Sequence, residues 1–152
     1  MGTRPLTGWL VCFSLLLGGC GGDDGPEMGD VTGLVTLDGQ PLPKASVRFV
    51  PENASPSIGI TDDEGRYELQ YSSSRNGAIV GMHTVRISTH RNAGEDDDGN
   101  RTPAVPEKVP AEYNTGAAEN PDMKREVKPD ANEINFELKS GGQIVQPAPS
   151  DG

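Results

Sequence analysis

The chain has 152 residues, of which 33% are hydrophobic and 5% aromatic, so it can bury one modest core and form one domain at most. Its 23 acidic and 13 basic residues give a formal net charge of -10, which disfavours binding to nucleic acid or to an anionic lipid surface. Cationic ligands and a plain effect on solubility both remain open.

The first twenty residues have the order of a secretory signal, with a positive end, an apolar middle and a small-residue exit. Arg4 is the only charged side chain before Asp23, and the apolar run of residues 9–17 ends at Gly18, Gly19 and Cys20. Because about 20 apolar residues are needed to span a bilayer, this run is too short for a spanning helix. The segment is therefore predicted to direct export.

Residues 17–20, Leu-Gly-Gly-Cys, resemble the lipobox of bacterial lipoproteins. The resemblance implies that residues 1–19 are a signal peptide and that Cys20 is acylated, becomes the first residue of the mature chain and anchors it to the membrane. The alternative is a general signal peptide with a chance cysteine. If Cys12 leaves with the signal and Cys20 carries lipid, no free thiol remains for catalysis or metal binding.

Residues 20–30 contain four glycines and a proline without apolar periodicity, and they are predicted to form a flexible tether. In the lipoprotein family an Asp directly after the acylated Cys retains the protein in the inner membrane. Here Gly21 holds that place. The resemblance therefore favours the outer membrane, facing the periplasm, over the inner membrane.

Alternating apolar and polar residues predict a series of strands along the rest of the chain. Residues 31–37 and 45–50 are predicted to pair as an antiparallel hairpin, because Asp38-Gly39 and Pro41 interrupt the alternation and Gly39 accepts a positive φ. Further strands are predicted at residues 57–62, 66–71, 81–89, 123–127 and 132–138. The side chains expected to be buried together are Phe49, Leu69, Val85, Ile87 and Phe136.

These segments together resemble the carboxypeptidase regulatory-like domain. The motifs that carry the resemblance are Val31-Thr32-Gly33-x-Val35-x-Leu37-x-Gly39-x-Pro41-Leu42, Ala45-x-Val47-x-Phe49, Thr61-Asp62-x-x-Gly65-x-Tyr67-x-Leu69 and Gly81-x-His83-x-Val85-x-Ile87. Residues 110–114 and 132–138 are similar to the Pro-x-x-Tyr-Asn element and the last strand of short bacterial lipoproteins built from one such domain. The resemblance implies that residues 31–140 form an all-β, seven-stranded Greek-key β-sandwich of the transthyretin (prealbumin) type. Lys44 departs from the family pattern, which often has Gly before Ala, so the geometry of this turn stays open.

Two segments lack strand periodicity. Residues 90–109 contain four consecutive acids and two prolines, with Pro110 closing the segment, and a loop of this length is either functional or disordered. Residues 141–152 are punctuated by Gly and Pro and are predicted to form a disordered tail.

The residue patterns do not predict catalysis, a cofactor or a metal site. Asp96, Asp98 and Asn100 alternate like the start of a calcium loop, but the glutamate and the helices of an EF-hand are missing, so a solvated acidic loop is favoured. His83 and His90 are seven residues apart, which on a regular strand places them on opposite faces. The sequence also lacks a Gly-rich phosphate loop, a Gly-x-Ser-x-Gly elbow and a His-Glu-x-x-His motif.

The favoured function is that of a membrane-anchored envelope lipoprotein whose non-catalytic β-sandwich acts as a structural or protein-binding module. The expected partners are the membrane, through lipidated Cys20, and an envelope protein or glycan, and not nucleic acid. The alternative is a carbohydrate- or ligand-binding domain that uses Tyr71, Tyr113 and the 90–109 loop. Loops can vary without disturbing a sheet, so the expected binding residues are Glu95, Asp96, Asp97, Asp98 and Tyr113.

Overall fold

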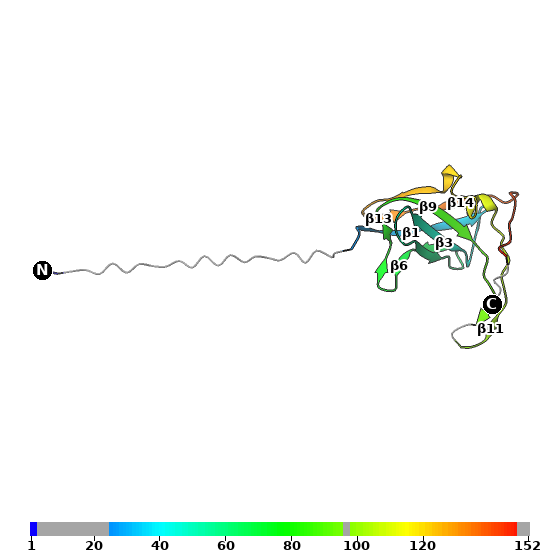
Figure 1. The fold of residues 1–152 in the computed structure, drawn as a ribbon, viewed down its shortest axis with the longest axis horizontal. Helices are drawn as coiled ribbons and strands as arrows, with labels where there is room; N and C mark the ends of the chain where they lie inside the picture. Colours follow the sequence, from blue (N-terminus) through cyan, green and yellow to red (C-terminus); the bar gives the residue numbers. More distant parts are fainter. Residues whose placement is uncertain (3–24, 96–97, 149–152) are drawn as a thin grey trace.

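The computed structural model describes residues 1–2, 25–95 and 98–148, and Figure 1 shows an all-β body. Two sheets enclose one hydrophobic core, which is consistent with the predicted β-sandwich. The described residues contain no α-helix, only short 3-10 turns. No helix among them is long and apolar enough to cross a bilayer. Cys20 and the predicted signal peptide, apart from its first two residues, lie outside the described residues.

The first sheet is organised around one long strand, β1 (Met28–Leu37). Two segments pair with β1 in parallel, β13 (Asp130–Glu133) and β14 (Phe136–Leu138). Three segments pair with it in antiparallel fashion, β2 (Gln40–Pro41), β5 (Arg66–Glu68) and β8 (Ala78–Ile79). Met28, Gly29 and Asp30 belong to β1, so the strand begins inside the segment predicted to be a tether.

The second sheet is antiparallel throughout and has the order β12-β9-β3-β4-β6-β7. Its central strands are β9 (Gly81–Ser88), β3 (Ser46–Pro51) and β4 (Ser57–Ile60). Its outer strands are β12 (Lys124–Val127), β6 (Gln70–Ser72) and β7 (Arg75–Asn76). β12, which lies within the strand predicted at residues 123–127, is at the sheet edge. Between β9 and β12 lie two short 3-10 turns, η1 (Ala111–Tyr113) and η2 (Pro121–Met123).

The predicted core is confirmed. Its five side chains are all buried in one cluster that includes residues from both sheets. The ring of Phe49 lies 5.7 Å from His83, 6.2 Å from Phe136 and 6.5 Å from Tyr67, between ring centroids. The guanidinium carbon of Arg125 lies 4.9 Å from the centroid of Phe136, so an aromatic cluster with a cation above it lies between the sheets.

The predicted hairpin between residues 31–37 and 45–50 is wrong, because β1 and β3 belong to different sheets. The turn at Asp38 and Gly39, with φ of 51° and 80°, instead joins β1 to the short β2. The chain then passes to the other sheet, and Lys44 adopts a φ of 57° before β3 begins. Alternation shows that each strand has one buried face, but it does not say whether two strands lie side by side or face each other across a core.

The predicted strand at residues 66–71 also divides between the sheets. β5 pairs with β1, whereas β6 pairs with β4. Leu69 lies fully buried at the change of sheet, where its amide donates to the carbonyl oxygen of Val31 (3.0 Å). A strand that turns a corner in this way closes one side of the sandwich.

Candidate functional site

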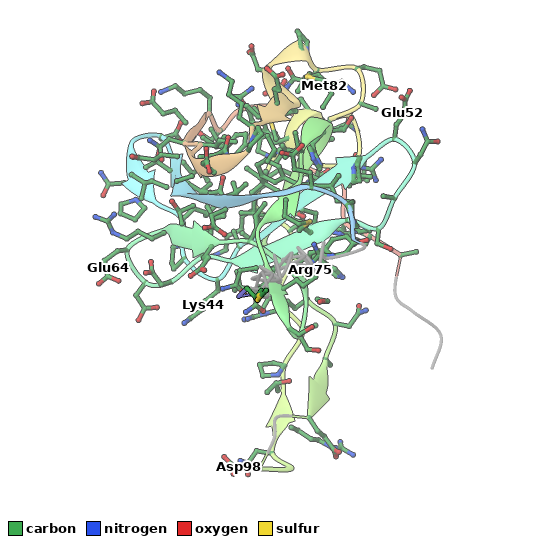
Figure 2. All side chains as sticks on the ribbon, turned by 90° about the vertical axis from the view of Figure 1, so that its left-hand side faces the viewer. Lys44, Glu52, Glu64, Arg75, Met82 and Asp98 are labelled. Atoms are coloured by element: carbon green, nitrogen blue, oxygen red, sulfur yellow. The ribbon has the colours of Figure 1, made fainter. Side chains whose placement is uncertain are left out.

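The segment expected to carry specificity is a projecting hairpin, called here the arm and comprising residues 91–105. β10 (Gly94–Glu95) pairs with β11 (Arg101–Thr102), and two backbone hydrogen bonds of 2.8 and 3.0 Å join Arg91 to Val105. Figure 2 shows Asp98 at the far end of the arm, away from both sheets. The arm therefore has local strand pairing where the sequence predicts only a loop.

Two acidic residues of the arm can be placed in the structure. Glu95 and Asp98 are exposed, while Asp96 and Asp97 lie outside the described residues. Glu95 faces Arg101 across the hairpin, so part of the acidic charge has a basic neighbour. Among the described residues, no three His, Cys, Asp or Glu side chains are grouped so as to hold a metal ion.

The arm is fixed to the body by one buried carboxylate, Glu107, which is 4% exposed. One of its oxygens, Oε1, accepts from the amides of Thr89 (2.9 Å), Lys108 (3.0 Å) and Val109 (3.0 Å). The same oxygen accepts from the hydroxyl of Thr89 (3.0 Å), and Oε2 accepts from the hydroxyl of Ser88. We call these five donors and Glu107 the carboxylate cage, which joins the end of β9 to the base of the arm.

The carboxylate cage holds Glu107 in its charged form. Burial alone raises the pKa of Glu107, but the hydrogen bonds from Ser88, Thr89 and Val109 lower it by more, so the net shift is below the ordinary value. With its oxygens already accepting five hydrogen bonds, this carboxylate is suited to hold the fold together rather than to act on a substrate.

The C-terminal segment contacts the same region. The side-chain amide of Gln146 accepts from the backbone amide of Glu107 (2.8 Å) and donates to its carbonyl oxygen (2.9 Å). The amide of Ala111 donates to the carbonyl oxygen of Gln143 (2.7 Å). Residues 143–146, within the tail predicted to be disordered, are therefore hydrogen-bonded to the body near the base of the arm.

The structure does not bring the two predicted binding tyrosines into one site. Tyr113 is half-buried, its hydroxyl accepts from the amide of Lys139 (3.3 Å), and burial raises its pKa. It lines an open hollow of about 350 Å³ together with Glu112, Glu119 and Asp122. Tyr71 lines a different hollow, of about 450 Å³, and the two hollows share no lining residue and include none from the arm.

The two histidines also make separate contacts. His83 is buried, and its Nε2 donates to the carbonyl oxygen of Ile79 (2.7 Å), while Nε2 of His90 lies 3.2 Å from Oδ1 of Asn92. One histidine is therefore part of the core, and the other contacts the beginning of the arm.

Sequence reasoning missed Glu107 and two exposed arginines, Arg48 and Arg86. Glu107 is one acid among many in the sequence, and only its buried partners distinguish it. The arginines alternate with core residues on β3 and β9, so the pattern does place them outward. Their position side by side follows from the register of two strands that are far apart in sequence.

Comparison with known proteins identifies no family for this chain. No protein-family model, curated protein or solved structure matches it. The function is therefore inferred from the residues and contacts described above.

Proposed function

We propose that this protein is a lipid-anchored lipoprotein of the bacterial cell envelope, and that its sandwich is a non-catalytic structural or protein-binding module. The lipobox-like residues 17–20 support the anchor. The motifs of residues 31–140, together with the two packed sheets, support assignment of the sandwich to the transthyretin-like, Greek-key type. Gly21 after Cys20 favours delivery to the outer membrane, facing the periplasm.

The observation that carries the proposal is the position of the two ends of the sandwich. Figure 1 shows the chain entering β1 at one end of the body, and the arm and the described C-terminal segment at the other. Met28 follows Cys20 by eight residues, which span at most about 26–29 Å when fully extended. Acylation of Cys20 would hold the start of β1 close to the membrane and direct the arm away from it.

A binding role for the arm agrees with its exposure and with its attachment. The described residues from Arg91 to Ala104 are all exposed, so they add little to the core. The base of the arm is nevertheless held by Glu107, which gives it a defined direction relative to β9. An exposed acidic tip on a fixed base is suited to capture a basic partner, with affinity that falls as salt concentration rises.

The alternative function, recognition of a glycan by Tyr71, Tyr113 and the arm, gains no support from the geometry. Sugar sites commonly combine an aromatic face with polar groups in one place. Here the two tyrosines line separate hollows, and Tyr113 has its hydroxyl bonded to the backbone of Lys139. Protein binding through the arm is therefore the stronger proposal.

The anchor is tested by fractionation of cells that express the Cys20→Ala variant. We expect this variant to leave the carbonate-resistant membrane fraction after signal cleavage, because the proposed acyl anchor is absent and no helix among the described residues is long and apolar enough to cross a bilayer. Cys12→Ala is the matched control, since Cys12 is predicted to leave with the signal, and it should remain membrane-bound. Retention of cleaved Cys20→Ala protein in the membrane would contradict the lipoprotein assignment.

The arm is tested by replacing residues 92–102 with a short Gly-Ser linker. We expect the melting temperature to change little, while cross-linking in intact cells loses the partners that the wild-type protein captures. If every partner is retained, the arm is a spacer. A glycan array probed with the wild type and with Tyr113→Ala tests the alternative, which requires binding that the substitution removes.

A further inference from the structure

Two arginines face each other on the outer surface of the second sheet. Arg48 on β3 and Arg86 on β9 are direct partners in the antiparallel register, and both side chains are exposed. Directly opposed residues of antiparallel strands have Cβ atoms about 4.5–5.5 Å apart, so two guanidinium groups at this spacing repel each other. The sheet therefore carries a local concentration of positive charge.

Neither arginine is paired with an acid among the described residues. The acids outnumber the bases by ten in the sequence, yet within the described part of the chain neither arginine has an ion pair or a side-chain hydrogen bond to another residue. Glu107 lines the same hollow as the arginines, but its carboxylate accepts its five hydrogen bonds from the other donors of the carboxylate cage. Two like charges are thus exposed side by side, although the chain contains 23 acidic residues that could form ion pairs with them.

The two arginines line a small hollow of about 160 Å³. Ser46 and Ser88 lie beside them, and Val145 and Pro147 of the C-terminal segment complete one side. The hydroxyl of Ser88 donates to Glu107, whereas that of Ser46 makes no hydrogen bond with any other described residue. The hollow therefore combines two guanidinium groups and one available hydroxyl with an apolar side, and the caged carboxylate of Glu107 also lines it.

The hollow is large enough for an oxyanion group. A water molecule occupies roughly 30 Å³ of liquid, so the hollow could hold about five waters or one oxyanion group with a few waters around it. Arginine is the side chain that best matches a carboxylate or phosphate, because its planar fork donates two parallel hydrogen bonds. We propose that Arg48 and Arg86 form a binding site for a single carboxylate or phosphate group of a ligand.

The remainder of such a ligand has a path along β9. Arg86 also lines a second hollow, of about 290 Å³, with Met82 and Lys124 among its other lining residues. Met82 is 61% exposed, and Nζ of Lys124 donates to the hydroxyl of Thr84 (2.6 Å). The second hollow thus offers an apolar contact, a further positive charge and one acid, Glu52, beside Arg86.

The test uses the purified full chain titrated with inorganic phosphate, with acetate in a parallel series, and sodium chloride at equal ionic strength as the reference. Binding is followed by the arginine Nε–Hε resonances and by the melting temperature. We expect saturable changes with phosphate that chloride does not produce. If acetate also produces a response, the site binds carboxylate and phosphate groups alike. If only phosphate produces one, the site binds phosphate groups.

Variants locate the site. Arg48→Gln and Arg86→Gln should each raise the Kd for phosphate about tenfold or more, since each removes charge-assisted hydrogen bonds. Arg48→Lys should weaken binding less, because it keeps the charge and loses the fork. Arg66→Gln, which alters an exposed arginine on β5 in the other sheet, is the matched control and should leave the Kd within about twofold.

Equal responses to phosphate and chloride, or an equal loss of phosphate affinity with Arg66→Gln, would overturn the proposal. Neither result bears on the lipid anchor.

Discussion

The hydroxyl of Tyr67 donates a hydrogen bond of 2.7 Å to the carbonyl oxygen of Ile134. This contact lies where the last strand is interrupted between β13 and β14, beside Gly33 of β1. At the same interruption, the amide of Leu34 donates to the side-chain oxygen of Asn135 (2.8 Å). Side chains thus supply hydrogen-bond partners where the ladder between β1 and the last strand is interrupted, while the Ile134 amide still donates to the backbone carbonyl oxygen of Thr32 (2.8 Å).

Replacing Tyr67 with Phe removes one donor and keeps the ring. Tyr67 is 4% exposed, so the variant leaves the Ile134 carbonyl oxygen without this partner in a largely buried place. We expect a loss of about 1–2 kcal/mol in the free energy of unfolding, measured by urea denaturation. Tyr71→Phe is the control, because Tyr71 is more exposed, and its effect should stay within about 0.5 kcal/mol. Equal effects of the two substitutions would mean that the Tyr67 hydrogen bond adds nothing.

Gly33 should tolerate no side chain. A Cβ atom at this position would lie 1.8 Å from the carbonyl oxygen of Ile134, and backbone on that side is held by the hydrogen bond from Tyr67. We expect Gly33→Ala to cost about 3 kcal/mol or more, with visible loss of folded protein in thermal melts. In Gly94→Ala, the new Cβ would meet only the hydroxyl of Thr102, at 3.7 Å, and the melting temperature should change little. A Gly33→Ala variant as stable as Gly94→Ala would show that the strands do not approach as described.

Strand parity predicted which side chains are buried, because the period of two follows from backbone geometry alone. Phe49, Val85 and Phe136 were placed correctly for that reason. The partners of each strand were harder to predict. Whether residues 31–37 pair with 45–50 or face them across the core depends on the turn at Lys44, whose left-handed φ is not typical of lysine.

The candidate sites were predicted less well than the core. Arg48 and Arg86 were placed outward by parity, but they meet through a non-local register. Glu107 is buried only because the ends of β9 and the arm converge on it, and a single acid gives no sequence signal for that. Contacts of this kind depend on tertiary structure, which periodicity does not specify.

Glu107 should make the stability of the protein depend on acid pH. Its folded-state pKa lies below the ordinary value of 4.5, so its stabilising effect is fully present above about that pH and is lost as pH falls through the lower folded value. Glu107→Gln should be less stable at neutral pH by about 1–3 kcal/mol, because the amide cannot accept all the hydrogen bonds of the cage. The variant should also lose less stability than the wild type as the pH falls below about 4.5.

Urea denaturation at several pH values checks this prediction. Glu119→Gln is the matched control, since Glu119 is exposed and lies outside the carboxylate cage, and its pH curve should follow that of the wild type. If Glu107→Gln also follows the wild-type curve, the acid dependence must come from other carboxyl groups.

Lys44 adopts a φ of 57°, in the left-handed region that favours glycine. The conformation is held by hydrogen bonds on both sides of the residue, since the Lys44 amide donates to the carbonyl oxygen of Thr61 (3.0 Å) and the next amide, of Ala45, donates to the Thr61 hydroxyl oxygen (2.8 Å). The Lys44 side chain pairs with Asp63 at 3.3 Å, but both side chains are more than half exposed, so this salt bridge adds at most about 1 kcal/mol.

Comparing Lys44→Gly with Lys44→Ala removes the salt bridge from both variants and isolates the backbone. A left-handed conformation costs a residue with a Cβ about 1–2 kcal/mol, and the greater freedom of glycine in the unfolded chain offsets about 0.4–1 kcal/mol of that difference. Lys44→Gly should therefore unfold at a higher urea concentration than Lys44→Ala, by about 0.5–1 kcal/mol in free energy. If Lys44→Ala is the more stable of the two, residue 44 is not left-handed in solution, and the chain must pass from β2 to β3 by a different turn.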